Sequence, residues 1–213
     1  MSTPQVYTWP IADEDAVALL QTTAGADTLL LNGALSNPNN RGLFVDFGKV
    51  SRVVTLTSAN NLGAVNVTIA GTLNGVVVTE TRVGPNNNTV ATTQVFSSVT
   101  SITVDDAVTA MSVGTGVSGY TKWFKSNKYP LASQLAVQVD ATATVSYSFQ
   151  VTLDEVNGNN SPLTFTPVVA LTTASADQLG VYTVPFNYCR VAMVTSDATG
   201  AMTVTMLQQG THS

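Results

Sequence analysis

The stretch from Ser51 to Gly116 reads SRVVTLTSANNLGAVNVTIAGTLNGVVVTETRVGPNNNTVATTQVFSSVTSITVDDAVTAMSVGTG, and it decides the fold. Short runs of alternating Val, Ile and Thr are interrupted by Gly, Asn or Asp at intervals of about 8–12 residues, which is typical of antiparallel β-sandwiches. Val65, Val67 and Ile69 alternate with polar residues, so one face of this strand is apolar. The pattern predicts an all-β protein, either an antiparallel β-sandwich or a jelly-roll-like arrangement.

The clearest turn signal in this stretch is Asn74-Gly75, which favours a two-residue type I′ hairpin. Elsewhere the runs between turn residues predict hairpins of consecutive strands. The expected pairs are 52–57 with 64–70, 135–139 with 144–153, and 190–195 with 202–207.

Changes in composition are compatible with two β subdomains. Gly114 to Gly119 is rich in glycine, and the segment that follows differs in composition from both of its flanks. We therefore expect an N-terminal arm with the first strands in 1–40, a β-sandwich meander in 41–119, a linker in 120–130, and a second β unit in 131–213 that packs on the first. Residues 13–21 begin with acidic residues and continue with apolar ones, which leaves a short helix and a strand both open.

The N-terminal segment MSTPQVYTWPIA contains two prolines, which makes it a poor helix and an extended arm. Such arms are ordered only when something holds them. Tyr7 and Trp9 are the residues that would hold it, either on its own domain or on a neighbouring molecule.

A weak internal similarity links two distant segments. Arg52 to Ser58 resembles Arg190 to Ser196, and each is followed by a glycine and a strand similar to V-x-V-T. Two related β units would produce this similarity. Recurrent turn chemistry in a β protein of low complexity would produce it equally well.

Charged residues make up only 10% of the chain, against roughly 25% in ordinary soluble domains. The surface must therefore consist largely of Thr, Ser, Asn and Gln, which lose less on burial than ions do. This favours packing against copies of the chain or against neighbours, although β-rich proteins are often rich in Thr and Asn for local reasons. The net charge is −5, and the only basic cluster, Lys122 to Lys128, is too small to predict nucleic-acid binding.

Aromatic residues accompany that basic cluster. Trp123 and Phe124 lie within it and Tyr129 follows it directly, and together with Tyr7 and Trp9 they are the residues we expect to contact other proteins. Exposed on a loop, the same three aromatics would suit a carbohydrate-binding or host-surface module.

The residues that usually carry chemistry are sparse. The chain has one cysteine, Cys189, within an apolar run, and one histidine, His212, so a zinc site of the usual type and a Ser–His–acid triad are not expected. Asp105, Asp106 and Asp197 could approach a calcium ion only from separate loops, and the usual calcium-loop pattern is missing. We predict no catalytic residue, metal or cofactor. We see neither a signal peptide nor an apolar run of about 18 residues in the sequence, so we predict no membrane partner.

A series of short motifs resembles a recurring β-rich structural protein of tailed bacteriophages. These motifs are Leu56-Thr-Ser-Ala-Asn-Asn-Leu-Gly63, Thr79-Glu80-Thr81, Gly84-Pro85-Asn-Asn-Asn-Thr89, Phe96-x-x-Val99-Thr-Ser-Ile102 and Met206-Leu-Gln-Gln-Gly210. The resemblance covers 51–116 well and 188–210 loosely.

The resemblance implies a non-enzymatic virion component, made in the host cytoplasm. The first expectation is a capsid decoration (cement) protein that binds the major capsid protein as a homo-oligomer, a trimer or a dimer, and stabilises capsomer contacts. A head–tail connector, a tail component and a carbohydrate-binding module are the alternatives.

Overall fold

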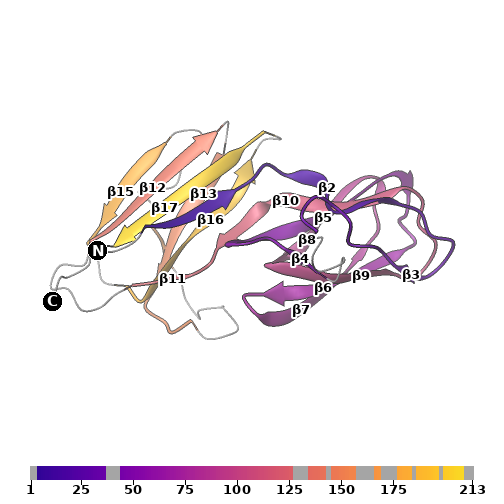
Figure 1. Cartoon of the computed structure of the whole chain (residues 1–213), viewed down its shortest axis with the longest axis horizontal. Coiled ribbons are helices and arrows are strands. Elements are labelled where there is room, and N and C mark those ends of the chain that lie inside the picture. Colours follow the sequence, from indigo (N-terminus) through magenta and orange to yellow (C-terminus); the bar gives the residue numbers. More distant parts are fainter. Residues whose placement is uncertain are drawn as a thin grey trace. The chain divides into compact units, whose positions relative to one another are not determined.

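The computed structural model describes residues 4–36, 44–126, 134–142, 145–156, 166–168, 177–183, 186–196 and 199–208. The chain divides into two compact units. Unit 1 comprises Met1–Ile11 and Ser118–Ser213, and unit 2 comprises Ala12–Val117. In the described part of the chain all secondary-structure elements are strands, and they pair antiparallel (Figure 1). The predicted all-β antiparallel sandwich is confirmed.

Unit 2 consists of two sheets. The first has the order β2 (Asp13–Gln21), β10 (Met111–Thr121, of which the part to Val117 belongs here), β5 (Val50–Asn61) and β8 (Asn86–Phe96). The second has the order β3 (Asp27–Thr28), β9 (Ser98–Val104), β6 (Asn66–Leu73) and β7 (Val76–Val83), and β4 (Val45–Asp46) also pairs with β9.

The core of unit 2 follows from the period-2 alternation in its strands. Val67 and Ile69 on β6 lie opposite Val104 and Ile102 on β9, and all four side chains are buried. They belong to one apolar cluster with Val54, Leu56 and other side chains from the β5 sheet. One face of each sheet therefore supplies the core, as the sequence predicts.

The predicted hairpin of 52–57 with 64–70 is wrong, because β5 and β6 lie in different sheets. The segment between them carries Leu62, whose buried side chain belongs to the core. Leu62 N donates to Pro85 O at 2.7 Å, and Gly84 N donates to Val65 O at 2.8 Å. The two sheet-to-sheet crossings, β5 to β6 and β7 to β8, are thus bonded side by side. A Cβ atom at Gly84 would lie 2.6 Å from Leu62 O, so this approach requires glycine.

The Asn74-Gly75 prediction is confirmed. Both residues have positive φ, 52° and 88°, and Leu73 pairs with Val76 across the turn.

Unit 1 also consists of two sheets. In one, β14 (Thr166–Val168), β13 (Val145–Thr152) and β16 (Tyr188–Ser196) are followed by the last residues of β10 and by β11 (Phe124–Lys125), which both pair with β16. In the other, the order is β1 (Gln5–Trp9), β17 (Ala201–Gln208), β12 (Leu135–Thr142) and β15 (Gln178–Tyr182). Figure 1 shows β1, in indigo, beside β17, in yellow.

The two sheets of unit 1 meet through aromatic residues. Phe149 on β13 lies 4.4 Å from Tyr182 on β15, measured between ring centroids. The predicted hairpins of 135–139 with 144–153 and of 190–195 with 202–207 are wrong for the same reason as in unit 2. β12 and β17 pair with each other, and β13 pairs with β16, so each predicted partner lies in the opposite sheet.

Three further expectations need correction. The segment 1–40 is not one region, since 1–11 belongs to unit 1 and the rest to unit 2. Residues 5–9 are extended but not a free arm, because they pair with β17 along the whole of β1, which is the arrangement on its own domain that the sequence left open. The predicted linker 120–130 includes residues of β10 and β11 that pair with β16. The alternatives left open for 13–21 resolve to a strand, β2.

Candidate interaction surface

The two N-terminal aromatics predicted to contact other proteins are buried within unit 1. Trp9 is 1% exposed, and Tyr7 is also buried. Tyr7 lies opposite Val204 and Trp9 lies opposite Met202, whose side chains belong to the same core. Burial raises the pKa of Tyr7 to about 12. Both residues therefore hold the first strand on its own unit and are not presented to a partner.

The second predicted cluster surrounds a buried arginine on β16. The guanidinium carbon of Arg190 lies 3.8 Å from the ring centroid of Tyr120 and 4.3 Å from that of Trp123. Its Nε donates to Gln150 Oε1 at 2.7 Å. Burial lowers the pKa of Arg190 to about 10. This value is still well above neutral pH, so Arg190 remains a cation there. One ring face of Trp123 is thus occupied by an internal cation, which leaves less of it for stacking on a sugar.

The other members of that cluster have different positions. Phe124 lies on β11 opposite Cys189 and is half-buried. Lys125 lies 5.7 Å from the Tyr188 ring centroid. The predicted residue Tyr129 lies outside the described residues.

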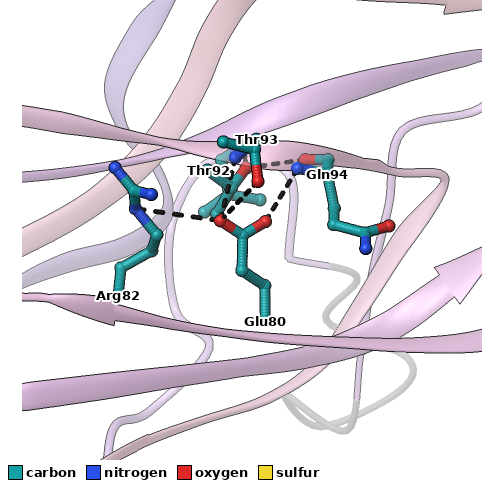
Figure 2. Close-up of polar contacts among 6 residues, drawn as sticks. Glu80, Arg82, Thr92, Thr93 and Gln94 are labelled. Atoms are coloured by element: carbon teal, nitrogen blue, oxygen red, sulfur yellow. Dashed lines mark hydrogen bonds and ion pairs between the residues drawn. The ribbon is translucent and has the colours of Figure 1, made fainter.

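The densest group of polar contacts that we find around a carboxylate is centred on Glu80, a half-buried residue of β7 (Figure 2). Its Oε1 accepts from the backbone N of Thr93 at 2.9 Å and from Thr93 Oγ1 at 3.0 Å, and its Oε2 accepts from the backbone N of Gln94 at 2.7 Å. Arg82 Nε lies 3.7 Å from Oε1, too far for a hydrogen bond. The three hydrogen bonds that Glu80 accepts all join β7 to β8, so the carboxylate has a structural role.

The remaining residues considered for chemistry serve turns or the core. Asp105 accepts from the backbone N and from Nδ2 of Asn66, both at 2.7 Å, and these bonds hold the pKa of the Asp105 carboxyl below its usual range. Asp106 accepts from the backbone N of Ala107, and Asp197 and His212 lie outside the described residues. Burial raises the pKa of the Cys189 thiol well above its ordinary value. Within the described ranges, no three His, Cys, Asp or Glu residues come together as a metal site would require.

An exposed apolar face on unit 1 is the feature that sequence reasoning missed. It is the outer face of the sheet β1–β17–β12–β15. Ala136 pairs with Leu207 on one side and with Val181 on the other, which forms one cross-strand row. Val181 is 58% exposed, so this row faces away from the core.

The neighbouring row of the same face extends this surface. Gln138 pairs with Thr205 on one side and with Leu179 on the other, and Thr205 pairs with Val6. Leu179 is 71% exposed, and Val6 and Leu207 are exposed as well. We define the apolar outer face by the four exposed side chains Val6, Leu179, Val181 and Leu207 together with Ala136. The next row carries Asp140 opposite Thr203, and its carboxylate accepts from Gln138 Nε2 at 2.9 Å, so charge borders the second row without belonging to it.

Unit 2 presents a different outer face on its sheet β7–β6–β9. Thr81 pairs with Thr68, and their hydroxyl oxygens lie 2.9 Å apart. Thr68 in turn pairs with Thr103 on β9. The same face of β7 also exposes Val77 and Val83, but the threonine row lies between them. The unit 1 face instead brings its exposed aliphatic side chains into two adjacent rows, which makes it the stronger candidate for a protein contact.

No helix long and apolar enough to cross a membrane occurs in the described part of the protein. A scan of family models found no match to this chain, and searches of curated proteins and of solved structures found none either.

Proposed function

We propose that the protein is a non-enzymatic structural component of a tailed-bacteriophage virion, and in particular a decoration protein that binds the outer surface of the capsid shell. The observation that carries this proposal is the apolar outer face of unit 1, where two adjacent cross-strand rows expose aliphatic side chains without a charge. The phage-like motifs in 51–116 supply the virion context.

The chemistry of this face supports a protein partner. Leu179 and Val181 lie on β15, which pairs only with β12 among the described strands, so one edge of the face is open to a neighbour. Burying such side chains contributes about 25 cal/mol per Å² of apolar surface, without the penalty of desolvating ions. The partner we propose is the major capsid protein, bound by a homo-oligomer of this chain.

The test is binding to purified capsids that lack this protein. Leu179→Lys with Val181→Lys places two cations on the apolar outer face, and we expect binding in a co-sedimentation assay to weaken at least about tenfold. The matched control is Val77→Lys with Thr79→Lys, at exposed positions of β7 in unit 2. Equal binding of both variants and the wild-type protein would refute a role for this face, provided that thermal unfolding shows each variant to be folded.

Copy number in the virion separates the decoration proposal from its alternatives. Quantitative mass spectrometry of purified virions would report copies of this chain relative to the portal ring. Hundreds of copies agree with a shell component, whereas about a dozen would move the protein to the head–tail junction or the tail. Absence from virions would refute the virion proposal altogether.

A further inference from the structure

The two units have the same strand order. In unit 2 the sheets read β8–β5–β10–β2 and β7–β6–β9–β3. In unit 1 they read β10/β11–β16–β13–β14 and β1–β17–β12–β15. Each position in one unit thus has a counterpart in the other, and the pairings recorded for both are antiparallel, including β6 with β9 and β17 with β12.

The order in which the chain visits these positions differs by a circular shift. Unit 2 visits its strands in the order β2, β3, β5, β6, β7, β8, β9, β10, with the two-residue β4 counted with β3, because both pair with the edge of β9 opposite β6. The counterparts in unit 1 are β14, β15, β16, β17, β1, β10/β11, β12 and β13. Unit 1 is therefore a circular permutation of unit 2, with the break between β17 and β1. This agrees with the two-unit explanation of the sequence similarity around Arg52 and Arg190.

The break lies where unit 2 has its two-residue hairpin turn. β6 and β7 are joined by Asn74-Gly75, with Leu73 opposite Val76. Their counterparts, β17 and β1, are not consecutive in the chain, because all the other described strands lie between them, although Met206 still lies opposite Gln5. A two-residue turn therefore holds β7 on β6, whereas no such turn joins β1 to β17.

On its C-terminal side, β1 is joined covalently to unit 2. The residues between β1 and β2 are Pro10, Ile11 and Ala12, and the division between the two units falls between Ile11 and Ala12. β1 is an edge strand, since β17 is its one recorded partner among the described strands. It can leave unit 1 without disturbing any other pairing given for that unit, yet unit 1 is incomplete without the buried rings of Tyr7 and Trp9.

From this we infer that the edge of β17 is a strand-exchange interface, which accepts β1 from a second copy of this chain. The incoming strand is identical to the resident one, so the same five residue pairs, from Gln5 with Met206 to Trp9 with Met202, form within one chain or between two. Exchange of an identical element is a low-cost route to oligomers. The resident strand has the advantage of tethering, so exchange increases with protein concentration.

Two single-cysteine variants test the inference. Val6→Cys and Thr205→Cys are made in separate full-length chains, both with Cys189→Ala, because Val6 and Thr205 lie directly opposite each other. The two proteins are mixed, unfolded, refolded together at high concentration and oxidised. A disulfide joining the two different chains forms readily when β1 of one copy lies on β17 of the other, and chance collisions supply only the background. We expect heterodimers several-fold above those of the matched pair Val77→Cys with Thr72→Cys, which lie opposite each other on the hairpin-linked β6 and β7.

A second substitution separates seated exchange from chance collision. Trp9→Ala in the Val6→Cys chain removes a side chain that is buried when β1 is seated, so the heterodimer yield should fall to that of the Val77→Cys control pair. Ile11→Ala, at an exposed position just beyond β1, should leave the yield unchanged. Heterodimer yields no higher than those of the Val77→Cys and Thr72→Cys pair, or yields that do not respond to Trp9→Ala, would overturn the inference. The test does not depend on any role in a virion.

Discussion

Glu80 on β7 and Gln94 on β8 join the two sheets of unit 2, since a Glu80 carboxylate oxygen accepts the backbone N–H of Gln94 at 2.7 Å (Figure 2). The contact exists because β8 bulges at this point. Val53 pairs with Val95 but Thr55 pairs with Ala91, so the intervening N–H groups leave the ladder and need another acceptor. The sequence around Glu80 gives no sign of this role, because an alternating Thr-Glu-Thr-Arg strand is equally compatible with a solvated face.

Replacing Glu80 should destabilise unit 2 more than replacing its ion-pair partner. Glu80→Ala removes the acceptor for three hydrogen bonds, and we expect a loss of about 1–2 kcal/mol in the free energy of unfolding, since water can reach part of the site. Arg82→Ala, which removes only a 3.7 Å ion pair, should cost less than about 1 kcal/mol. Denaturant unfolding measures both free energies. Equal losses in the two variants would show that the Glu80 carboxylate does not join the two sheets.

Removing the N-terminal aromatic should destabilise unit 1. Trp9 is 1% exposed in the β1–β17 pairing, so Trp9→Ala should cost about 3–5 kcal/mol. Val6→Ala, at an exposed position of the same strand, should cost less than about 1 kcal/mol. Thermal and denaturant unfolding of both variants give the comparison. If Trp9→Ala left the stability unchanged, these residues would be the free arm that the prolines suggest.

The sequence predicted strands far better than their partners. Both Asn74-Gly75 and 60–63 look like hairpin turns, but only the first has the two positive-φ positions that force adjacent strands to pair. The second carries Leu62, a buried side chain that directs the chain across to the other sheet. An apolar residue inside an otherwise polar turn is the signal that could have distinguished them.

The candidate surface was missed for a related reason. Leu179 and Val181 alternate with Gly180 and Tyr182, and period 2 alone does not say which set faces inward. The ring of Tyr182 contacts Phe149, which fixes the inward face and leaves the two aliphatic side chains outside. That contact joins two strands of different sheets, and local sequence patterns carry no information about it.

The thiol of Cys189 should be unreactive until unit 1 unfolds. Its side chain is fully buried, and burial raises the thiol pKa, so the thiolate that attacks disulfide reagents is scarce in the folded protein. We expect reaction with a soluble aromatic disulfide to be at least about a hundredfold slower than in denaturant. Fast labelling of the native protein, with no change in circular dichroism, would contradict the burial of this residue.

The Asn66–Asp105 contact should make a small acid-dependent contribution to stability. The hydrogen bonds from Asn66 lower the folded pKa of Asp105 below its ordinary value of 3.8, so the stabilisation is present above that value and is lost as the pH falls through the lower folded pKa. A carboxyl ¹³C NMR titration should show the lowered pKa in the wild-type protein. In Asn66→Ala the value should return toward 3.8, and an identical titration in both proteins would show that Asn66 is not the cause.

Arg190 should stabilise unit 1 through its shape as well as its charge. Its planar guanidinium packs against the rings of Tyr120 and Trp123 while Nε bonds to Gln150, and an ammonium group offers neither the plane nor that fixed donor. Arg190→Lys should therefore cost about 1–3 kcal/mol in the free energy of unfolding although the positive charge remains.

In a Trp9→Phe background, Trp123 is the sole tryptophan of the chain, and its fluorescence should shift to the red as water replaces the guanidinium. Lys125→Ala is the matched control, because Lys125 lies 5.7 Å from the Tyr188 ring and is not part of this stack. If Arg190→Lys and Lys125→Ala gave equal stability and the same emission, charge alone would account for the arginine.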